Sequence, residues 1–255
     1  MSRFADYIQG VSVQPATPMM PLTHVCQEYF FREILETKRL KPSPCRVFAE
    51  ELLYFFYGKP AYTPKTDGAA VDASGLAPVC LVCKPHLVPH AKRIAPFDTG
   101  AFASGRYSDY LHQKMKIDDF LLDGSPEMPG RIVAHFFSSN SEYFKGKPAT
   151  IQIPPTQFEA RAYHNLITDN GKTSSDHRRS AIEIQTDLPL TIERDSVLLV
   201  VLPEVFLDDP DVRVRVFQDW SAEVVPYPTY HCDPEQYQGA VAYVVWKFLR
   251  EKHFI

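Results

Sequence analysis

Glycine is scarce in this sequence, and its scarcity limits how the chain can hold a phosphate group. The 255 residues include 11 glycines and 22 prolines, although glycine outnumbers proline in an average protein. Neither the dinucleotide-binding glycine pattern nor the P-loop pattern occurs, so a nucleotide site must be built in another way. Frequent proline without low complexity predicts short elements with rigid connections and argues against a regular helical bundle.

Long hydrophobic runs, a signal sequence and an excess of one charge are missing too. No apolar run approaches the roughly 20 residues that span a bilayer, and the N-terminal stretch lacks the apolar core of a signal peptide. With 27 basic and 31 acidic residues the net charge is −4, which argues against a broadly basic surface that coats nucleic acid. The cysteines are odd in number, which favours reduced thiols: Cys26, Cys45, Cys80, Cys83 and Cys232. We expect a cytoplasmic protein without membrane contact.

The distribution of apolar residues predicts one α+β domain over residues 1–255. The chain is 45% hydrophobic, enough to build a core of that size and too much for a disordered protein. Helices are expected over 25–40 and, as a C-terminal helix packed on the domain, over 233–252. Strands are expected over 52–57, 78–84, 181–185, 196–202 and 212–217, the last because valine alternates with arginine there.

One cluster has the ligand types of a zinc site. Cys80, Cys83, His86 and His90 follow one another closely, whereas a zinc finger separates its two ligand pairs by roughly 12 residues so that the chain can wrap the ion. On a strand, Cys80 and Cys83 point to opposite faces. We therefore predict no metal site here and interpret the four residues as buried thiols and surface histidines.

The segment Asp98-Thr99-Gly100-Ala101 resembles the signature of aspartic proteases. That chemistry needs two carboxylates that share one proton, and the chain contains no second such triplet, so only a homodimer would provide both. The alternative interpretation is a turn in which Asp98 binds its own backbone. A dimeric protease that uses Asp98 stays open as an alternative function.

Three further segments matter because of their order. The first is Thr23-His24 before the expected helix, the second is the aromatic run at 53–62, and the third is the strand at 177–185 that carries Glu183. In this order they resemble DarT-like ADP-ribosyltransferases, in which a Thr-His strand end, an aromatic strand and a late strand with the catalytic glutamate follow one another. The resemblance covers residues 20–64 and 175–205.

The resemblance implies an ADP-ribosyltransferase-like fold, a split mixed β-sheet with surrounding helices, and NAD as a substrate. It implies that Glu183 is the catalytic carboxylate and that His24 binds a ribose of NAD. The chemistry agrees, because breaking the nicotinamide–ribose bond creates positive charge that a carboxylate stabilises. Aromatic surfaces for nicotinamide are available at Tyr54, Tyr57 and Tyr62, and a cation for the diphosphate at Arg46 or Lys59.

The acceptor of the ADP-ribose group is less constrained. The resemblance implies a nucleic-acid base and a role in a toxin–antitoxin or phage-defence system, with an antitoxin as partner. Lys172, His177, Arg178 and Arg179 lie close to Glu183 in the sequence, and we interpret Arg178 and Arg179 as acceptor-binding residues that contact phosphates. A protein acceptor, NAD hydrolysis without an acceptor, and a non-catalytic interaction protein of a defence complex are the alternatives.

Overall fold

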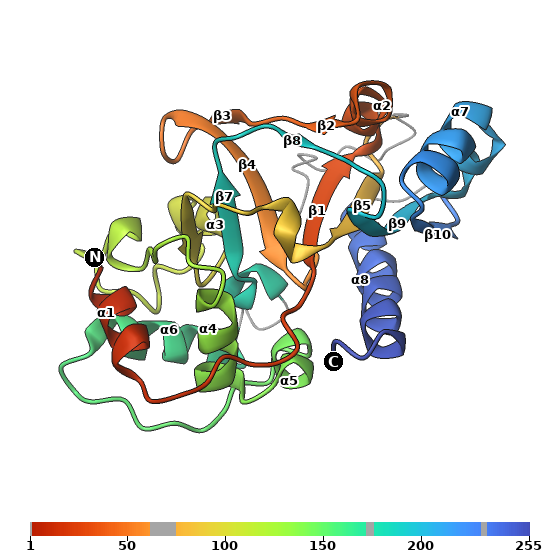
Figure 1. Ribbon diagram of the computed structural model, residues 1–255. Helices are drawn as coiled ribbons and strands as arrows, with labels where there is room; N and C mark the ends of the chain where they lie inside the picture. Colours follow the sequence, from red (N-terminus) through yellow and green to blue (C-terminus); the bar gives the residue numbers. More distant parts are fainter. Residues whose placement is uncertain (1, 62–74, 172–175, 231–233) are drawn as a thin grey trace.

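The computed structural model describes residues 2–61, 75–171, 176–230 and 234–255. Within these residues an eight-stranded mixed sheet carries helices around it, in the order β10-β9-β5-β1-β4-β7-β6 with β3 paired to β4 (Figure 1). The pair β9–β10 is parallel and the other pairs are antiparallel. The expected α+β class, with a mixed sheet and surrounding helices, is confirmed. Tyr62, Lys172 and Cys232 lie outside the described residues.

The strands are short, as the frequent prolines predict. Those of the main sheet are β1 (Leu22–Gln27), β3 (Ser43–Cys45), β4 (Glu50–Tyr57), β5 (Pro78–Cys83), β6 (Arg93–Ala95), β7 (Glu183–Thr186), β9 (Val197–Pro203) and β10 (Glu223–Tyr227). A separate antiparallel pair joins β2 (Arg39–Leu40) to β8 (Leu190–Thr191). Every residue of β5 is buried, and β9 is buried except at Leu198. This matches the continuous aliphatic runs of strands that are covered on both faces.

The sheet opens between β1 and β4. These strands pair at only two positions, Leu22 with Tyr57 and Thr23 with Phe56. Beyond Thr23, β1 continues along β5 for its whole length, while β4 pairs with β7 and β3. The two halves of the sheet therefore diverge like a fork, which is visible where β1 and β4 separate in Figure 1.

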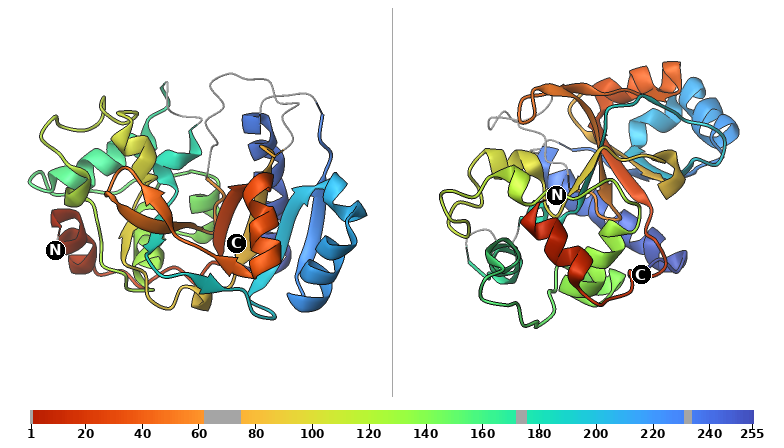
Figure 2. Two further views of the ribbon diagram at one scale, coloured as in Figure 1. Left: turned by 90° about the horizontal axis from the view of Figure 1, so that it is seen from above. Right: turned by 60° about the vertical axis from the view of Figure 1, so that its left-hand side comes forward.

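The helices cover both halves of this fork, and one hydrophobic cluster runs through the molecule from Phe4 to Leu249. Figure 2 shows α1, α4 and α6 gathered at the β6 end of the sheet and α7 at the β10 end, while α8 packs on β5, β9 and β10. The helices are α1 (Arg3–Gly10), α2 (Glu28–Thr37), α3 (Thr99–Ala103), α4 (Met128–Phe137), α5 (Asn140–Phe144), α6 (Phe158–Thr168), α7 (Pro210–Arg213) and α8 (Pro234–Glu251). None of the helices in the described part of the chain is long and apolar enough to cross a membrane.

The helix predicted over 25–40 begins later than expected. Residues up to Gln27 extend β1, because their backbone pairs with β5 at all six positions. Helix α2 then ends at Thr37, where Lys38 adopts a left-handed conformation with φ of 55° and leads into β2. The helix starts later because residues 25–27 pair with β5, a segment that lies about 50 residues further along the chain. The pattern of residues within 25–40 carries no information about this pairing. The C-terminal helix was predicted over 233–252 and spans Pro234–Glu251.

The strand predicted over 212–217 is wrong. This segment forms α7 and a π-helical turn (Val214–Asp219), which Asp209 caps by accepting a hydrogen bond from the backbone N–H of Asp211. Val212 and Val216 are buried, whereas Val214 is 46% exposed. The two buried valines are four residues apart, which is the spacing of one helix face. A pattern that alternates every second residue also places valines four apart, so it fits a helix as well as a strand.

Candidate functional site

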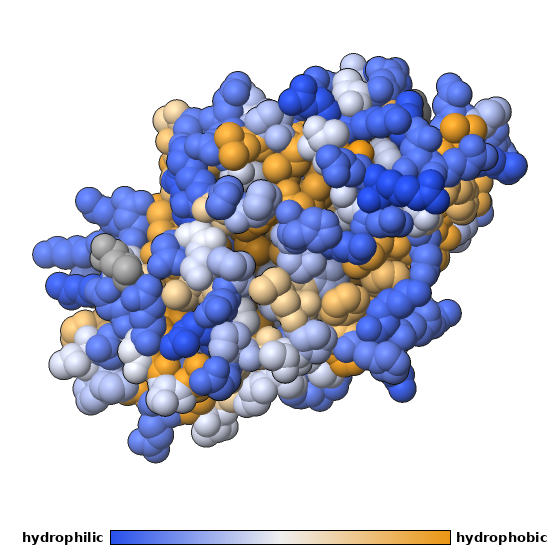
Figure 3. Space-filling model, viewed as in Figure 1, coloured by the Kyte–Doolittle hydropathy of each residue, from blue (hydrophilic) through white to orange (hydrophobic). Residues whose placement is uncertain are grey.

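A cavity of about 530 Å³ lies in the fork between β1 and β4. Its walls come from β1, α2, the segment 39–43, β4, the turn at Asp98 and the first residue of β7. The size falls within the range of small-molecule sites, roughly 300–1,000 Å³. Figure 3 shows hydrophobic residues between hydrophilic rims on this face of the molecule. An apolar recess with a few polar groups at one end is the usual form of a ligand site.

Glu183 forms the polar end of the cavity. It is the first residue of β7, opposite Phe56 of β4, and its side chain is buried. The backbone N–H of Thr99 donates to Oε2 at 3.0 Å, the Thr99 hydroxyl donates to Oε1 at 2.7 Å, and the Gln185 amide also donates to Oε1. Burial and, after it, the nearby charge of Asp98 raise the pKa of Glu183 to about 7, although the three hydrogen bonds oppose this shift.

Asp98 has a capping role beside Glu183. Its side chain accepts a hydrogen bond from the backbone N–H of Ala101 at 2.6 Å and so begins helix α3. Burial raises the pKa of this carboxyl, while the Ala101 hydrogen bond and the charge of Arg178 oppose the change. The turn interpretation of the Asp-Thr-Gly segment therefore describes its structure.

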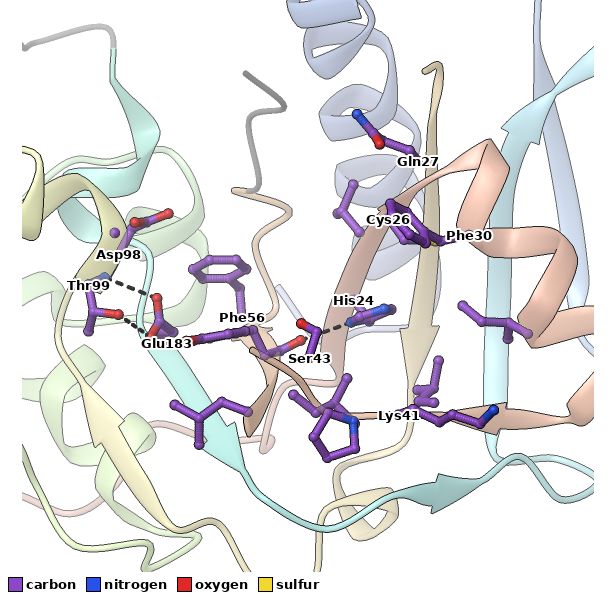
Figure 4. A pocket seen from close by; sticks show the side chains of 18 of the residues that line it. His24, Cys26, Gln27, Phe30, Lys41, Ser43, Phe56, Asp98, Thr99 and Glu183 are labelled. Atoms are coloured by element: carbon purple, nitrogen blue, oxygen red, sulfur yellow. Dashed lines mark hydrogen bonds between the residues drawn. The ribbon is translucent and has the colours of Figure 1, made fainter. Parts of the chain in front are cut away.

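His24 lies on the opposite wall of the cavity (Figure 4). Its Nδ1 lies 2.9 Å from the carbonyl oxygen of Tyr54, and its ring lies 5.5 Å from that of Phe55. A carbonyl only accepts hydrogen bonds, so Nδ1 carries the proton. Burial lowers the pKa of His24, which favours a neutral ring. Nε2 is then an acceptor for a ligand hydroxyl.

The three tyrosines predicted to contact nicotinamide do not share one position. Tyr54 lines the cavity, and burial followed by the Cys45 thiol and the Glu183 charge raises the pKa of its hydroxyl. Tyr57 does not line it: the hydroxyl accepts a hydrogen bond from the backbone N–H of Met20 at 3.0 Å in the core. The alternation of side chains along β4 explains the difference, because Tyr57 is adjacent to Phe56, which faces the cavity. Tyr62 lies outside the described residues.

The two cationic residues predicted to bind the diphosphate, Arg46 and Lys59, do not line the cavity. Arg46 is exposed and does not line the cavity. Lys59 is buried away from it, donates to the Ser180 hydroxyl at 2.9 Å, and has a pKa lowered to about 7 by burial and then by the charge of Arg179. The cations that do line the cavity are Arg39 and Lys41, from β2 and the residues after it. Lys41 forms an ion pair with Glu33 at 2.7 Å.

Arg178 and Arg179, the predicted acceptor-binding residues, are engaged in internal contacts within a 3-10 helix (His177–Ser180). Arg178 forms two hydrogen bonds of 2.8 Å with the Asp176 carboxylate. Arg179 is buried and donates to backbone carbonyls near the end of α6, those of Leu166 and Asp169. Neither residue lines the cavity. Their sequence position beside Glu183 reflects packing against α6 and the Asp98 turn.

The Cys-His cluster has the burial expected for structural thiols. Cys80 and Cys83 are buried in β5, and burial raises the pKa of Cys83 to about 12. A thiol that stays protonated is a poor metal ligand. In the described ranges, no three His, Cys, Asp or Glu side chains are grouped so that they could hold a metal ion.

Comparison with protein-family models, with curated proteins and with solved structures finds no match for this chain. Function must therefore be argued from the cavity. Of the residues predicted for the site, the fork brings together His24, Tyr54 and Glu183. Sequence reasoning missed Thr99 and Gln185, the donors to Glu183. Gln185 had a signal, since it lies two residues after Glu183 on the same face of a strand, but nothing in the sequence places Thr99 beside β7.

Proposed function

We propose that this protein transfers ADP-ribose from NAD to a macromolecular acceptor and that the fork cavity holds NAD. One observation carries the proposal: His24, Tyr54 and Glu183, which are far apart in the sequence and come from three different strands, line a single cavity. These are the residues whose order resembles DarT-like ADP-ribosyltransferases. Each also has the chemistry that the reaction needs.

In the proposed reaction the bond between C1′ of the ribose and the nicotinamide nitrogen breaks. Nicotinamide leaves with the bonding electron pair, and a nucleophilic atom of the acceptor forms the new bond to C1′ and loses a proton. The transition state carries positive charge on the sugar, as in glycoside cleavage. The Glu183 carboxylate stabilises that charge and accepts a hydrogen bond from a ribose hydroxyl. Because its pKa is about 7, its ionised fraction increases as the pH rises through neutrality.

The remaining walls of the cavity suit the other parts of NAD. Nε2 of His24 accepts a hydrogen bond from a ribose hydroxyl, and the aromatic ring of Tyr54 gives a flat surface for nicotinamide or adenine. Arg39 and Lys41 supply positive charge for the diphosphate, in place of Arg46 and Lys59. This set needs no glycine-rich loop.

The resemblance implies a nucleic-acid acceptor, a toxin or defence role and an antitoxin partner. The surface beside the cavity supports the first of these. Tyr29 and Phe30 of α2 are 59% and 53% exposed, their rings meet edge to face at 5.6 Å, and the guanidinium of Arg32 lies 4.9 Å from the Tyr29 ring centroid. Exposed aromatic rings beside a cation are the usual platform for unpaired bases.

The other proposals receive less support from the geometry. The dimeric protease requires an Asp98 carboxyl that shares a proton with a second aspartate, whereas this carboxyl caps α3. The non-catalytic interaction protein predicts no binding of NAD. Calorimetry with NAD separates it from the transferase.

The test follows release of nicotinamide from NAD in the presence of single-stranded DNA, RNA or protein. Glu183→Gln should lower the rate at least about 100-fold while NAD still binds. Glu142→Gln is the matched control, since Glu142 is exposed on α5 and pairs with Lys145 at 3.0 Å; it should behave as the wild type. Full activity in Glu183→Gln, or no binding of NAD to the wild type, would contradict the proposal.

A further inference from the structure

Two residues to which no sequence pattern assigned a role beside Glu183 donate hydrogen bonds to its carboxylate. We infer that Thr99 and Gln185 are positioning residues, which hold this carboxylate in one orientation at the cavity. The hydrogen bonds to Glu183 are the physical basis of this inference. Its consequence for catalysis rests on the proposed function of Glu183.

The geometry of the contacts fixes the carboxylate plane. Thr99 uses both of its donors, the backbone N–H on Oε2 at 3.0 Å and the hydroxyl on Oε1 at 2.7 Å. Figure 4 shows this pair of contacts between α3 and β7. Gln185 adds a second donor to Oε1. Three donors from two elements restrict rotation of the carboxyl group more strongly than one contact would.

Thr99 is itself held in place. Asp98 caps α3 through the N–H of Ala101 at 2.6 Å, and the backbone N–H of Asp98 donates to the carbonyl of Arg178 at 3.0 Å. The turn is therefore fastened to the 3-10 helix that leads into β7. Gln185 is fully buried in β7. Both donors belong to rigid elements, which is the arrangement a precise site requires.

The same contacts influence the charge of Glu183. The ionisable groups that act on it are Asp98, from the α3 cap, Tyr54 of β4 and Tyr107. Burial raises the pKa of both tyrosines, so they are neutral near pH 7, and Asp98 is the charge that opposes ionisation. Hydrogen bonds from Thr99 and Gln185 favour the ionised form. Removing either donor should therefore raise the pKa of Glu183 as well as release its orientation.

The kinetic test uses Thr99→Val and Gln185→Met, which remove a donor and keep most of the side-chain volume. At pH 7 each should lower kcat for NAD cleavage at least about tenfold, with KM for NAD unchanged within about twofold. The acid limb of the pH–rate profile should move to higher pH. Thr99→Ser keeps the hydroxyl and should restore the wild-type profile. Thr156→Val, at an exposed threonine before α6, is the matched control.

A second measurement does not depend on catalysis. Carbon-13 NMR of the Glu183 carboxyl gives its pKa directly, and the pKa should rise in both variants. If the variants fold, as thermal unfolding shows, yet keep the wild-type kcat and the wild-type pKa of Glu183, the inference is wrong while the proposed function stands. If the wild type does not cleave NAD but the pKa rises in the variants, the proposed function fails and the holding of Glu183 stands. Should Thr99→Val not fold, Gln185→Met decides by the same readouts.

Discussion

Glu183→Gln should make the folded protein more stable above neutral pH, although it removes the proposed catalytic group. The wild-type carboxylate is buried beside Asp98, and both raise its pKa from 4.5 to about 7. The folded protein then binds a proton that the unfolded chain has already released. The contribution of Glu183 to stability is therefore fully present below about pH 4.5 and is lost as the pH rises through 7.

The size of the effect follows from the shift of the pKa. A difference between 4.5 and about 7 corresponds to about 3 kcal/mol of stability, since each pKa unit is worth about 1.4 kcal/mol. Glutamine does not titrate, so the variant lacks this loss. Relative to wild type, the free energy of unfolding of Glu183→Gln should increase by about 3 kcal/mol between pH 4.5 and pH 8.

Glutamine can form a hydrogen bond at each position of the Glu183 carboxylate. Its oxygen replaces Oε2 and accepts from the Thr99 N–H, and its amide nitrogen replaces Oε1. The Thr99 hydroxyl then rotates to accept, and the Gln185 amide turns so that its oxygen accepts as well. That oxygen is buried without a hydrogen-bond partner in the wild type. The turn places the Gln185 amide nitrogen where that oxygen had been, so the substitution removes a buried charge and exchanges one unpaired group of Gln185 for another.

The assay is urea unfolding of wild type, Glu183→Gln and the control Glu142→Gln at several values between pH 4.5 and pH 8. The difference between Glu183→Gln and wild type should grow with pH, and the control should show no such trend. A constant difference over the whole range would mean that the pKa of Glu183 is not raised by folding. The argument from burial would then be refuted.

Three further predictions test the electrostatics and the fold. Asp98→Asn keeps the helix cap but removes the charge beside Glu183, so the pKa of Glu183 should fall and the acid limb of NAD cleavage should move to lower pH; a protease that uses Asp98 would instead lose all activity. Lys59 has a pKa lowered from 10.5 to about 7, so the folded state loses this proton at a lower pH than the unfolded chain. The contribution of Lys59 to stability therefore rises with pH above 7. Relative to Lys59→Met, wild type should gain about 2 kcal/mol between pH 7 and pH 9 in urea unfolding. A gap independent of pH would contradict the burial of a titrating amine. Val216→Ala should cost about 2 kcal/mol and Val214→Ala much less, because only Val216 is buried; equal losses in thermal unfolding would favour the strand over the helix.

The sequence was informative where the pattern of burial is local and simple. The aliphatic runs in β5 and β9 are buried strands because nearly every side chain in them is apolar, and the last helix follows from its spacing of apolar residues. The alternating segment that became α7 shows the limit. Two valines four residues apart satisfy a helix and a strand equally, and packing against the rest of the molecule decides between them.

The sequence could indicate the residues of the candidate site that lie on strands, but not the residue that comes from the turn at Asp98. His24, Tyr54 and Glu183 lie on neighbouring strands, whose order a resemblance can convey. Thr99 reaches Glu183 only because the chain between β6 and α3 returns to the start of β7. That contact depends on tertiary folding over many residues, which no spacing in the sequence encodes. The Asp-Thr-Gly motif marked the turn as unusual, but the chemistry it suggested was that of aspartic proteases, whereas Asp98 caps α3.

The fork also explains why a histidine lines the cavity. β1 and β4 pair at only two positions, so the carbonyl groups of β4 at the last of these positions and beyond it need other donors. Side chains of β1 supply these: the Thr23 hydroxyl donates to the carbonyl of Phe56 at 3.2 Å, and His24 Nδ1 meets that of Tyr54 at 2.9 Å. His24 therefore closes the base of the fork with one ring nitrogen and leaves the other for a ligand. His24→Asn can keep the hydrogen bond to the Tyr54 carbonyl but lacks a second ring nitrogen for a ligand. It should therefore leave thermal unfolding nearly unchanged while it weakens the proposed binding of NAD, measured by calorimetry.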